Sequence, residues 1–218
     1  MPTQDRRVIA IDGPAASGKS SVARELARRL GFVYVNSGAM YRAVTWSVLD
    51  RGLEPTDKVG IAKFIGGVDL GGKFVDGEFH LLIDDLDLTP HLHEDRVNAE
   101  VSLVSTVPEV RKLLVQRMRD YAGDHDLVIE GRDIGSVVFP NTPYKFYVDA
   151  SPEVRAQRRA AQGHRDEIAR RDRADSSRAA SPLMVVKDAE VIDTSKLTIA
   201  QVVDEIIERI KRKGFATS

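Results

Sequence analysis

The feature that most constrains this chain is a glycine-containing loop near its start, between an apolar run and an amphipathic segment. Val8 to Ile11 is apolar, and the loop after it reads Gly13-Pro14-Ala15-Ala16-Ser17-Gly18-Lys19-Ser20. A glycine, four residues and then Gly-Lys-Ser is the spacing of a phosphate-binding loop. Glycines let backbone amides approach phosphate oxygens, and the following helix adds unpaired N–H groups and the positive end of its dipole. The loop from Gly13 to Ser21 therefore predicts binding of a nucleoside triphosphate.

The polar side chains of this loop fit a phosphate and its counter-ion. Lys19 supplies a positive charge for the outer phosphates, and Ser20 supplies a hydroxyl oxygen near a bound magnesium ion. Ser21 offers a second hydroxyl directly after it, so either serine is a candidate ligand. We expect this triphosphate and Mg²⁺ as cofactors.

The amino-acid composition limits the kinds of partner that the chain is expected to bind. The 218 residues carry 32 basic and 33 acidic side chains, which gives no sign of binding to nucleic acid or to an acidic membrane surface. The absence of cysteine removes disulfides, thiol catalysis and cysteine metal sites, and it suits a reducing cytosol. No apolar stretch approaches membrane-spanning length. We expect a cytoplasmic monomer that acts on small molecules.

Strand and helix patterns alternate along most of the chain. Apolar runs predict strands at 8–11, 32–35, 127–129, 144–148 and 190–192, and amphipathic patterns predict helices at 21–30, 39–49 and 108–121, then from Ser151 and from Thr198. The last two helices have clear starts: Pro152-Glu153 follows Ser151, and Thr198 and Gln201 form a capping box. Thr106 and Glu109 suggest another capping box before the 108–121 helix. The alternation predicts an α/β fold with a parallel sheet flanked by helices.

The pattern changes between residues 67 and 106. Short apolar pieces at 68–70, 73–75, 78–83 and 86–88 are separated by Gly-Gly and Asp-Gly turns, which predicts small antiparallel strands, and a helix is expected at 93–105. We therefore expect a core of residues 1–66 and 107–218 with an inserted subdomain at 67–106.

Arginines are dense after the 144–148 strand. They stand at positions 155, 158, 159, 165, 170, 171, 173 and 178, on both sides of Gly163. Most such residues form solvated surfaces, and nearby acids allow pairing within the helix. Arginines that close over a triphosphate also catalyse phosphoryl transfer, so residues of about 155–170 are a candidate lid, with Arg158 and Arg165 as candidate triphosphate contacts.

Four blocks of residues carry a resemblance to a known family. They are the phosphate-binding loop, Asn36-Ser37-Gly38-Ala39-Met40-Tyr41-Arg42, Glu130-Gly131-Arg132-Asp133-Ile134-Gly135-Ser136-Val137-Val138-Phe139-Pro140 and Arg178-Ala179-Ala180-Ser181-Pro182-Leu183. In order and over nearly the whole chain, they resemble the bacterial cytidylate kinases. The resemblance implies a nucleoside monophosphate kinase fold, with an enlarged monophosphate-binding insert, that transfers the γ-phosphate of ATP to CMP or dCMP with magnesium.

The same resemblance assigns roles to matching positions. It implies that Ser37 and Arg42 line the acceptor site, that Ser102, Arg111 and Asp133 contact cytosine, that Arg132, Arg171 and Arg178 bind phosphate, and that Asp175 binds the ribose. The expected catalytic residues are Lys19, Arg132, Arg158, Arg171 and Arg178. A carboxylate at Asp133 suits cytosine, because the exocyclic amine of cytosine is a donor where uracil has an acceptor oxygen. The segment between Arg159 and Arg171 is short for the family, so the lid is expected to be abbreviated.

Two alternatives stay open from the residues alone. One is a kinase for another small acceptor, such as UMP, AMP or a metabolite hydroxyl, and the other is a switch that binds and slowly hydrolyses ATP. Asp193-Thr194-Ser195 is either the adenine-binding loop that the resemblance implies or a plain loop before a helix. His91 and His93 are expected on a polar surface, and Trp46 is expected in the core.

Overall fold

The computed structural model describes residues 7–161 and 183–215 of the chain. These residues form two compact units, Met1–Tyr34 with Ala122–Ser218 and Val35–Tyr121, and each unit is described by itself.

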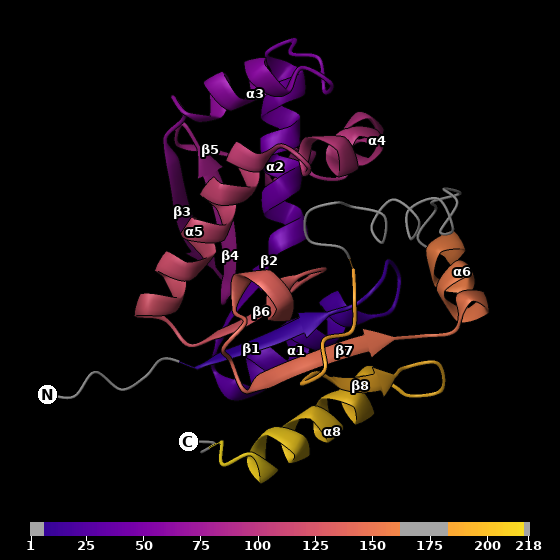
Figure 1. The fold of residues 1–218 in the computed structure, drawn as a ribbon. Coiled ribbons are helices and arrows are strands. Elements are labelled where there is room, and N and C mark those ends of the chain that lie inside the picture. Colours follow the sequence, from indigo (N-terminus) through magenta and orange to yellow (C-terminus); the bar gives the residue numbers. More distant parts are fainter. Residues whose placement is uncertain (1–6, 162–182, 216–218) are drawn as a thin grey trace, which may run out of the picture. The chain divides into compact units, whose positions relative to one another are not determined.

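The first unit is built on a parallel sheet (Figure 1). Its strands β1 (Val8–Asp12), β6 (Leu127–Gly131), β7 (Tyr144–Asp149) and β8 (Glu190–Asp193) lie in the order β6-β1-β7-β8, and every neighbouring pair is parallel. All residues of β1 and β6 are buried, as expected for strands covered on both faces. The α/β fold and the four strands are confirmed within one or two residues. The carboxyl ends of β1 and β6 meet, which is where ligands bind in such sheets.

Helices α1 (Lys19–Leu30) and α8 (Ile199–Arg212) pack on this sheet. The main core lies between them and the strands, and its buried side chains include Ile9, Ile11, Leu26, Tyr34, Phe146, Ile192, Val203 and Ile206. The capping box of Thr198 and Gln201 is confirmed, and α1 ends, as expected, at Gly31 with a left-handed backbone. Helix α6 (Pro152–Ala161) follows β7, and β2 (Val33–Asn36) begins in this unit.

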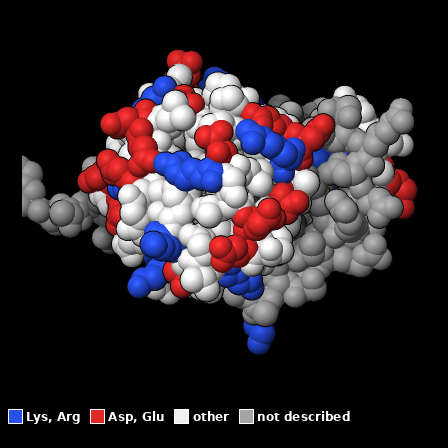
Figure 2. Space-filling view, turned by 90° about the horizontal axis from the view of Figure 1, so that it is seen from above, with Lys and Arg blue, Asp and Glu red and all other residues white. Residues whose placement is uncertain are grey.

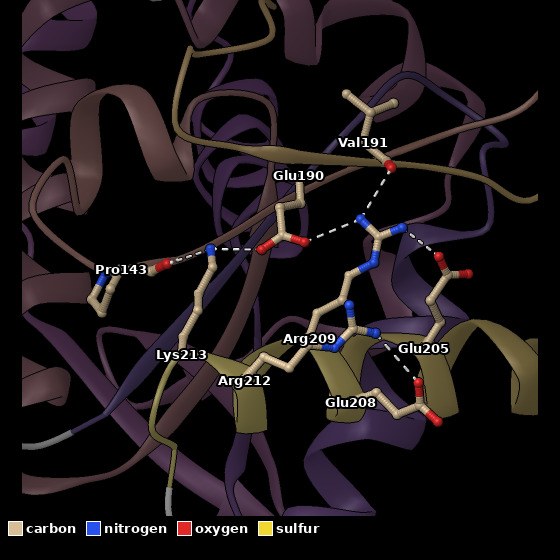
Figure 3. A network of polar contacts seen from close by, with 8 residues as sticks. All are labelled: Pro143, Glu190, Val191, Glu205, Glu208, Arg209, Arg212 and Lys213. Atoms are coloured by element: carbon tan, nitrogen blue, oxygen red, sulfur yellow. Dashed lines mark hydrogen bonds and ion pairs between the residues drawn. The ribbon is translucent and has the colours of Figure 1, made fainter.

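Side chains of α8 protect the edge strand β8 (Figure 3). The Arg209 guanidinium donates to the Val191 carbonyl at 3.5 Å and to the Glu190 carboxylate at 3.1 Å, and Lys213 Nζ lies 2.7 Å from the other oxygen of Glu190. These cations hold the pKa of Glu190 below its usual range, against the opposing effect of its partial burial. A cationic side chain on the carbonyl of an edge strand lowers the risk that the strand pairs with another chain.

The second unit combines helices with a small antiparallel sheet. Its helices are α2 (Ser37–Asp50), α3 (Lys58–Ile65), α4 (Asp95–Val104) and α5 (Pro108–Asp124), and its strands are β3 (Leu70–Val75), β4 (Glu78–Ile83) and β5 (Leu86–Asp87), followed by a 3₁₀ turn at Thr89–His91. Strand β4 pairs antiparallel with both β3 and β5, so the antiparallel strands are confirmed. The expected insert at 67–106 lies inside this unit.

Two local predictions in the second unit were wrong, and one helix was missed. Residues 68–70 and 73–75 are not separate strands, because Gly71-Gly72 runs straight through β3. A Cβ on Gly72 would lie 2.3 Å from the Phe79 ring, so the glycine makes room for the packed rings of Phe79 and Tyr121. The Thr106 hydroxyl donates to the Leu103 carbonyl rather than capping α5. Helix α3 was not predicted, although the Asp57 carboxylate caps it by accepting from the Gly60 amide at 2.9 Å.

Trp46 is buried as expected, but it also uses its polar edge. Its ring stacks on His91 with 4.7 Å between centroids, and its Nε1 donates to Glu94 at 3.2 Å. Glu94 also bonds His91 at 2.6 Å, so this histidine belongs to a packed pair. Among residues 7–161 and 183–215, no group of three potential ligand side chains could hold a metal ion.

The described surface shows no bias toward one charge on the face in Figure 2, where lysines and arginines are interspersed with acidic side chains. Within the described segments, no helix has the length and apolar character needed to cross a membrane.

Candidate active site

The glycine loop has the backbone shape of an anion-binding loop. A Cβ on Gly13 would lie 2.1 Å from the Val148 carbonyl oxygen of β7, so only glycine lets the loop pass this close to the sheet. Ala16 and Gly18 have left-handed backbones, with φ values of 59° and 91°. Such a turn followed by the start of α1 directs successive N–H groups toward one concavity. The loop therefore fits a phosphate group.

Arginines hold the carbonyl groups of the same loop. Arg132, after β6, donates to the Gly13 carbonyl at 2.8 Å, and Arg158 of α6 donates to the Ser17 carbonyl at 3.1 Å. Arg155 of α6 reaches the Ala15 carbonyl at 3.4 Å. Because guanidinium groups engage the carbonyls of alternate residues, the loop is held with its amide groups available to an anion.

Lys19 and Ser20 meet a buried carboxylate. Glu130 is the penultimate residue of β6 and is 2 % exposed. Its Oε1 accepts from the Ser20 hydroxyl at 2.7 Å and from the Tyr34 hydroxyl at 3.3 Å. Lys19 Nζ lies 3.6 Å from Glu130 Oε2 and donates to the Pro14 carbonyl at 3.3 Å. A hydroxyl beside a carboxylate is the oxygen donor set that magnesium prefers, so these residues fit the ion.

A cavity of about 360 Å³ lies beside the loop. Its lining residues include Ala16, Gly18, Ser21, Arg158, Thr194 and Leu197. Arg158 is fixed there, since its guanidinium donates to the Thr194 carbonyl at 2.9 Å and to the Thr194 hydroxyl at 3.0 Å. The cavity has an apolar side at Leu197 and polar groups near the phosphate-binding loop, as a site for a nucleotide base requires.

The acceptor residues expected in the first unit lie at the same edge of the sheet. Arg132 and Asp133 follow β6 directly, and Asp133 is 6 % exposed. Asp133 precedes a π-helical turn, Ile134–Val138, which the sequence did not predict. Irregular turns of this kind are frequent at functional sites. Arg165, Arg171, Asp175 and Arg178 lie outside the described residues, as does the lid beyond residue 161.

Ser37 and Arg42 lie on the first turns of α2 in the second unit. The Asn36 side chain caps this helix by accepting from the Ala39 amide at 3.0 Å. Arg42 Nε lies 3.5 Å from Asn98 Oδ1 of α4, and its guanidinium crosses the face of Gly38, where a Cβ would lie 3.0 Å from Arg42. The glycine therefore lets the arginine lie over the helix start.

Arg111 and Ser102 belong to the neighbouring helices of the same unit. Arg111 of α5 is 9 % exposed and lies 5.9 Å from the centre of the Tyr41 ring. Ser102 is half-buried on α4, and its carbonyl accepts from the Ser105 hydroxyl at 2.9 Å. The second unit thus carries Ser37 and Arg42 on α2 and Arg111 on α5, where Arg111 lies beside Tyr41 of α2.

Sequence reasoning missed two residues of the loop region. Glu130 was noted only as part of a motif, although an acidic residue at the end of an apolar strand next to β1 is a usable signal. Arg155 was counted in a basic tract, and its bond to the Ala15 carbonyl depends on the path of the chain between β7 and α6, which spacing does not reveal.

A parallel sheet, a phosphate-binding loop after its central strand and converging cations define a P-loop kinase. The fold is similar to that of shikimate kinase from Acinetobacter baumannii, with a TM-score of 0.50 at 15% identity, covering 97% of this chain and 96% of that one. The chain belongs to the cytidylate kinase family, whose sequence model matches residues 9–212.

Two curated relatives agree with this assignment. The cytidylate kinase of Pelotomaculum thermopropionicum is 42% identical over 214 residues, which cover 93% of this chain and 95% of that protein. The cytidylate kinase of Nocardia farcinica is 44% identical over 211 residues, which cover 91% of each.

Proposed function

We propose that this protein transfers the γ-phosphate of ATP directly to CMP or dCMP, giving ADP and CDP or dCDP. An oxygen of the acceptor phosphate attacks the γ-phosphorus in line, and the bond from that phosphorus to the β,γ-bridging oxygen breaks. The observation that carries the proposal is the loop from Gly13 to Ser20 at the carboxyl end of β1. Three arginines hold this loop, and one of them, Arg132, directly precedes Asp133.

On the donor side, the loop amides and Lys19 bind the β- and γ-phosphates, and the cavity lined by Thr194 and Leu197 receives the adenine. Ser20, with Glu130 behind it, is the proposed magnesium ligand, and Ser21 is the alternative. Magnesium supplies charge neutralisation on the phosphate oxygens. Arg158, already fixed at Ser17 and Thr194, lies where the triphosphate and the base would join.

On the acceptor side, the proposed residues are those that the resemblance to the cytidylate kinases implies. In the first unit, Arg132, Arg171 and Arg178 bind phosphate, Asp175 binds the ribose and Asp133 accepts from the cytosine amine. In the second unit, Ser37 and Arg42 line the acceptor site, and Ser102 and Arg111 contact the base. Binding UMP would place an acceptor oxygen against a buried carboxylate, which is costly, so CMP is preferred.

No general base is required for this reaction, because the acceptor is an ionised phosphate. Catalysis rests on alignment of the two phosphates and on neutralisation of the charge that spreads over the transferred group. The segment at about 155–170 is the proposed lid and residues 67–106 the proposed monophosphate-binding insert. The protein is proposed to act as a monomer in the cytoplasm, where nucleotides are available.

The test is ADP formation from ATP and Mg²⁺ with CMP, dCMP, UMP, AMP and GMP supplied separately. We expect strong stimulation by CMP and dCMP and little by UMP. Stimulation by another monophosphate would overturn the cytosine assignment, and ADP formation that no monophosphate stimulates would favour an ATP-hydrolysing switch.

A further inference from the structure

Asp12 is a buried carboxylate that the reaction described above does not use. It ends β1 directly before Gly13 and is 7 % exposed. Its two oxygens accept separate backbone bonds: Oδ1 from the Ile134 amide at 2.8 Å and Oδ2 from the Gly135 amide at 2.7 Å. These amides belong to the turn that follows Arg132-Asp133, so one side chain spans the ends of two strands.

A third bond joins the same two segments in the opposite direction. Arg132 donates to the Gly13 carbonyl at 2.8 Å. The residue pair Asp12-Gly13 is therefore bonded three times to the segment from Arg132 to Gly135. We propose that Asp12 is a positioning residue that holds the acceptor-reading pair Arg132-Asp133 in register with the phosphate-binding loop.

The packing around Gly135 leaves this link little freedom. A Cβ on Gly135 would lie 3.3 Å from Asp12 Oδ2 and 3.2 Å from Lys145 Cδ of β7. The Lys145 ammonium is engaged at 2.6 Å by the Pro140 carbonyl, so its stem lies fixed against the turn. The turn can thus shift little relative to β1 while the carboxylate keeps both bonds.

The charge of Asp12 matters because only the ionised carboxylate is an acceptor at both oxygens. In the protonated form one oxygen carries a hydrogen and faces a backbone N–H. Burial raises the pKa of Asp12 to about 6, the two amide bonds oppose this rise, the Asp133 charge adds to it and the Arg132 charge opposes it. Lys145 is the other charged side chain packed against this turn. Near pH 6 a fraction of the molecules therefore has a protonated Asp12 and a weakened link.

This inference rests on the proposed function, and its test is Asp12→Asn, with Asp126→Asn as the matched control. Asp126 joins the opposite ends of the same two strands by accepting from the Arg7 amide at 2.7 Å. We expect Asp12→Asn to lower kcat/KM for CMP by about tenfold or more through misalignment, while the KM for ATP is unchanged. Asp126→Asn should leave both values unchanged.

Two further readouts separate positioning from a merely structural role. At pH 8 the unfolding temperature of Asp12→Asn should be no lower than that of the wild type, because the variant buries no charge. The ratio of wild-type to Asp12→Asn kcat/KM for CMP should fall toward one as the pH drops through about 6, and the ionisation of CMP itself cancels in this ratio. The proposal would be overturned if Asp12→Asn impaired the use of CMP and ATP equally and also lowered the unfolding temperature. It would also be overturned if the ratio of the kcat/KM values did not change with pH.

Amide hydrogen exchange tests the link without any activity measurement. Ile134 and Gly135 should exchange faster in Asp12→Asn than in the wild type or in Asp126→Asn. If the wild type does not phosphorylate CMP, the proposed function fails, yet faster exchange would still support the link. Unchanged exchange at both amides would overturn the link whatever the substrate.

Discussion

At the residue scale, the two carboxylates near the carboxyl ends of β1 and β6 have different partners. Asp12 accepts from backbone amides, whereas Glu130 accepts from the Ser20 and Tyr34 hydroxyls and lies beside Lys19. One carboxylate therefore orders the turn after Asp133, and the other orders side chains of the phosphate-binding loop. Neither role could be predicted from residue type, since both depend on which groups the neighbouring strand end presents.

The raised pKa of Asp12 predicts how stability depends on pH. The folded protein binds this proton more tightly than the unfolded chain does, so the stability cost is fully present above about pH 6 and absent below the unfolded value near 3.8. Relative to Asp12→Asn, the wild type should lose about 2 kcal/mol of unfolding free energy between pH 4 and pH 8. Urea unfolding of both proteins across this range measures the difference. A difference that is constant with pH would show that Asp12 does not titrate in this way.

Asp133 is predicted to set the choice between pyrimidines. Asp133→Ala should reduce the ratio of kcat/KM for CMP to that for UMP by roughly tenfold to a hundredfold, since a hydrogen bond to a charged group contributes about 1.5–3 kcal/mol. Initial-rate kinetics with both acceptors measure this ratio. Asp126→Ala, at the other end of β6, is the control and should leave the ratio unchanged; an equal loss for CMP and UMP in Asp133→Ala would contradict the assignment.

At the element scale, α8 stabilises the edge of the parallel sheet. Arg209 contacts Glu205, Glu190 and the Val191 carbonyl, whereas Arg212 pairs only weakly with Glu208 in solvent (Figure 3). The two arginines are three residues apart on one helix, so they differ in contacts and little in helix propensity.

Arg209→Ala should therefore lower the free energy of unfolding by about 1 kcal/mol, because a partly buried network and an edge carbonyl lose their partner. Arg212→Ala should change it by nearly zero, as is usual for an exposed pair. Chemical unfolding of both variants gives the comparison. Equal effects of the two substitutions would show that the contacts to β8 contribute nothing beyond surface charge.

Most elements could be predicted because their patterns are local. Apolar β-branched runs gave the parallel strands, and the capping box at Thr198 gave the start of α8. Predictions failed where a tertiary contact decides the conformation. Gly71-Gly72 resembles a turn, yet ring packing keeps it in β3, and the π-helical turn after Asp133 depends on Asp12, more than a hundred residues earlier in the chain.

At the scale of the whole chain, distant segments meet at one edge of the first unit's sheet. Residues near positions 130–133, 155–158 and 194 surround the phosphate-binding loop at 13–20. The parallel arrangement predicts that strand ends meet there, so Arg132 and Asp133 could be placed from the sequence. The contacts of Arg155 and Arg158 to the loop could not, because they depend on how α6 leaves β7.

The central claim is that the γ-phosphate passes to CMP and not to water. The most direct measurement follows ATP labelled in the γ-phosphate, with Mg²⁺ and CMP, and identifies the labelled product by chromatography. The account predicts label in the β-phosphate of CDP, with little free inorganic phosphate. Label released as inorganic phosphate at a rate independent of CMP would contradict it.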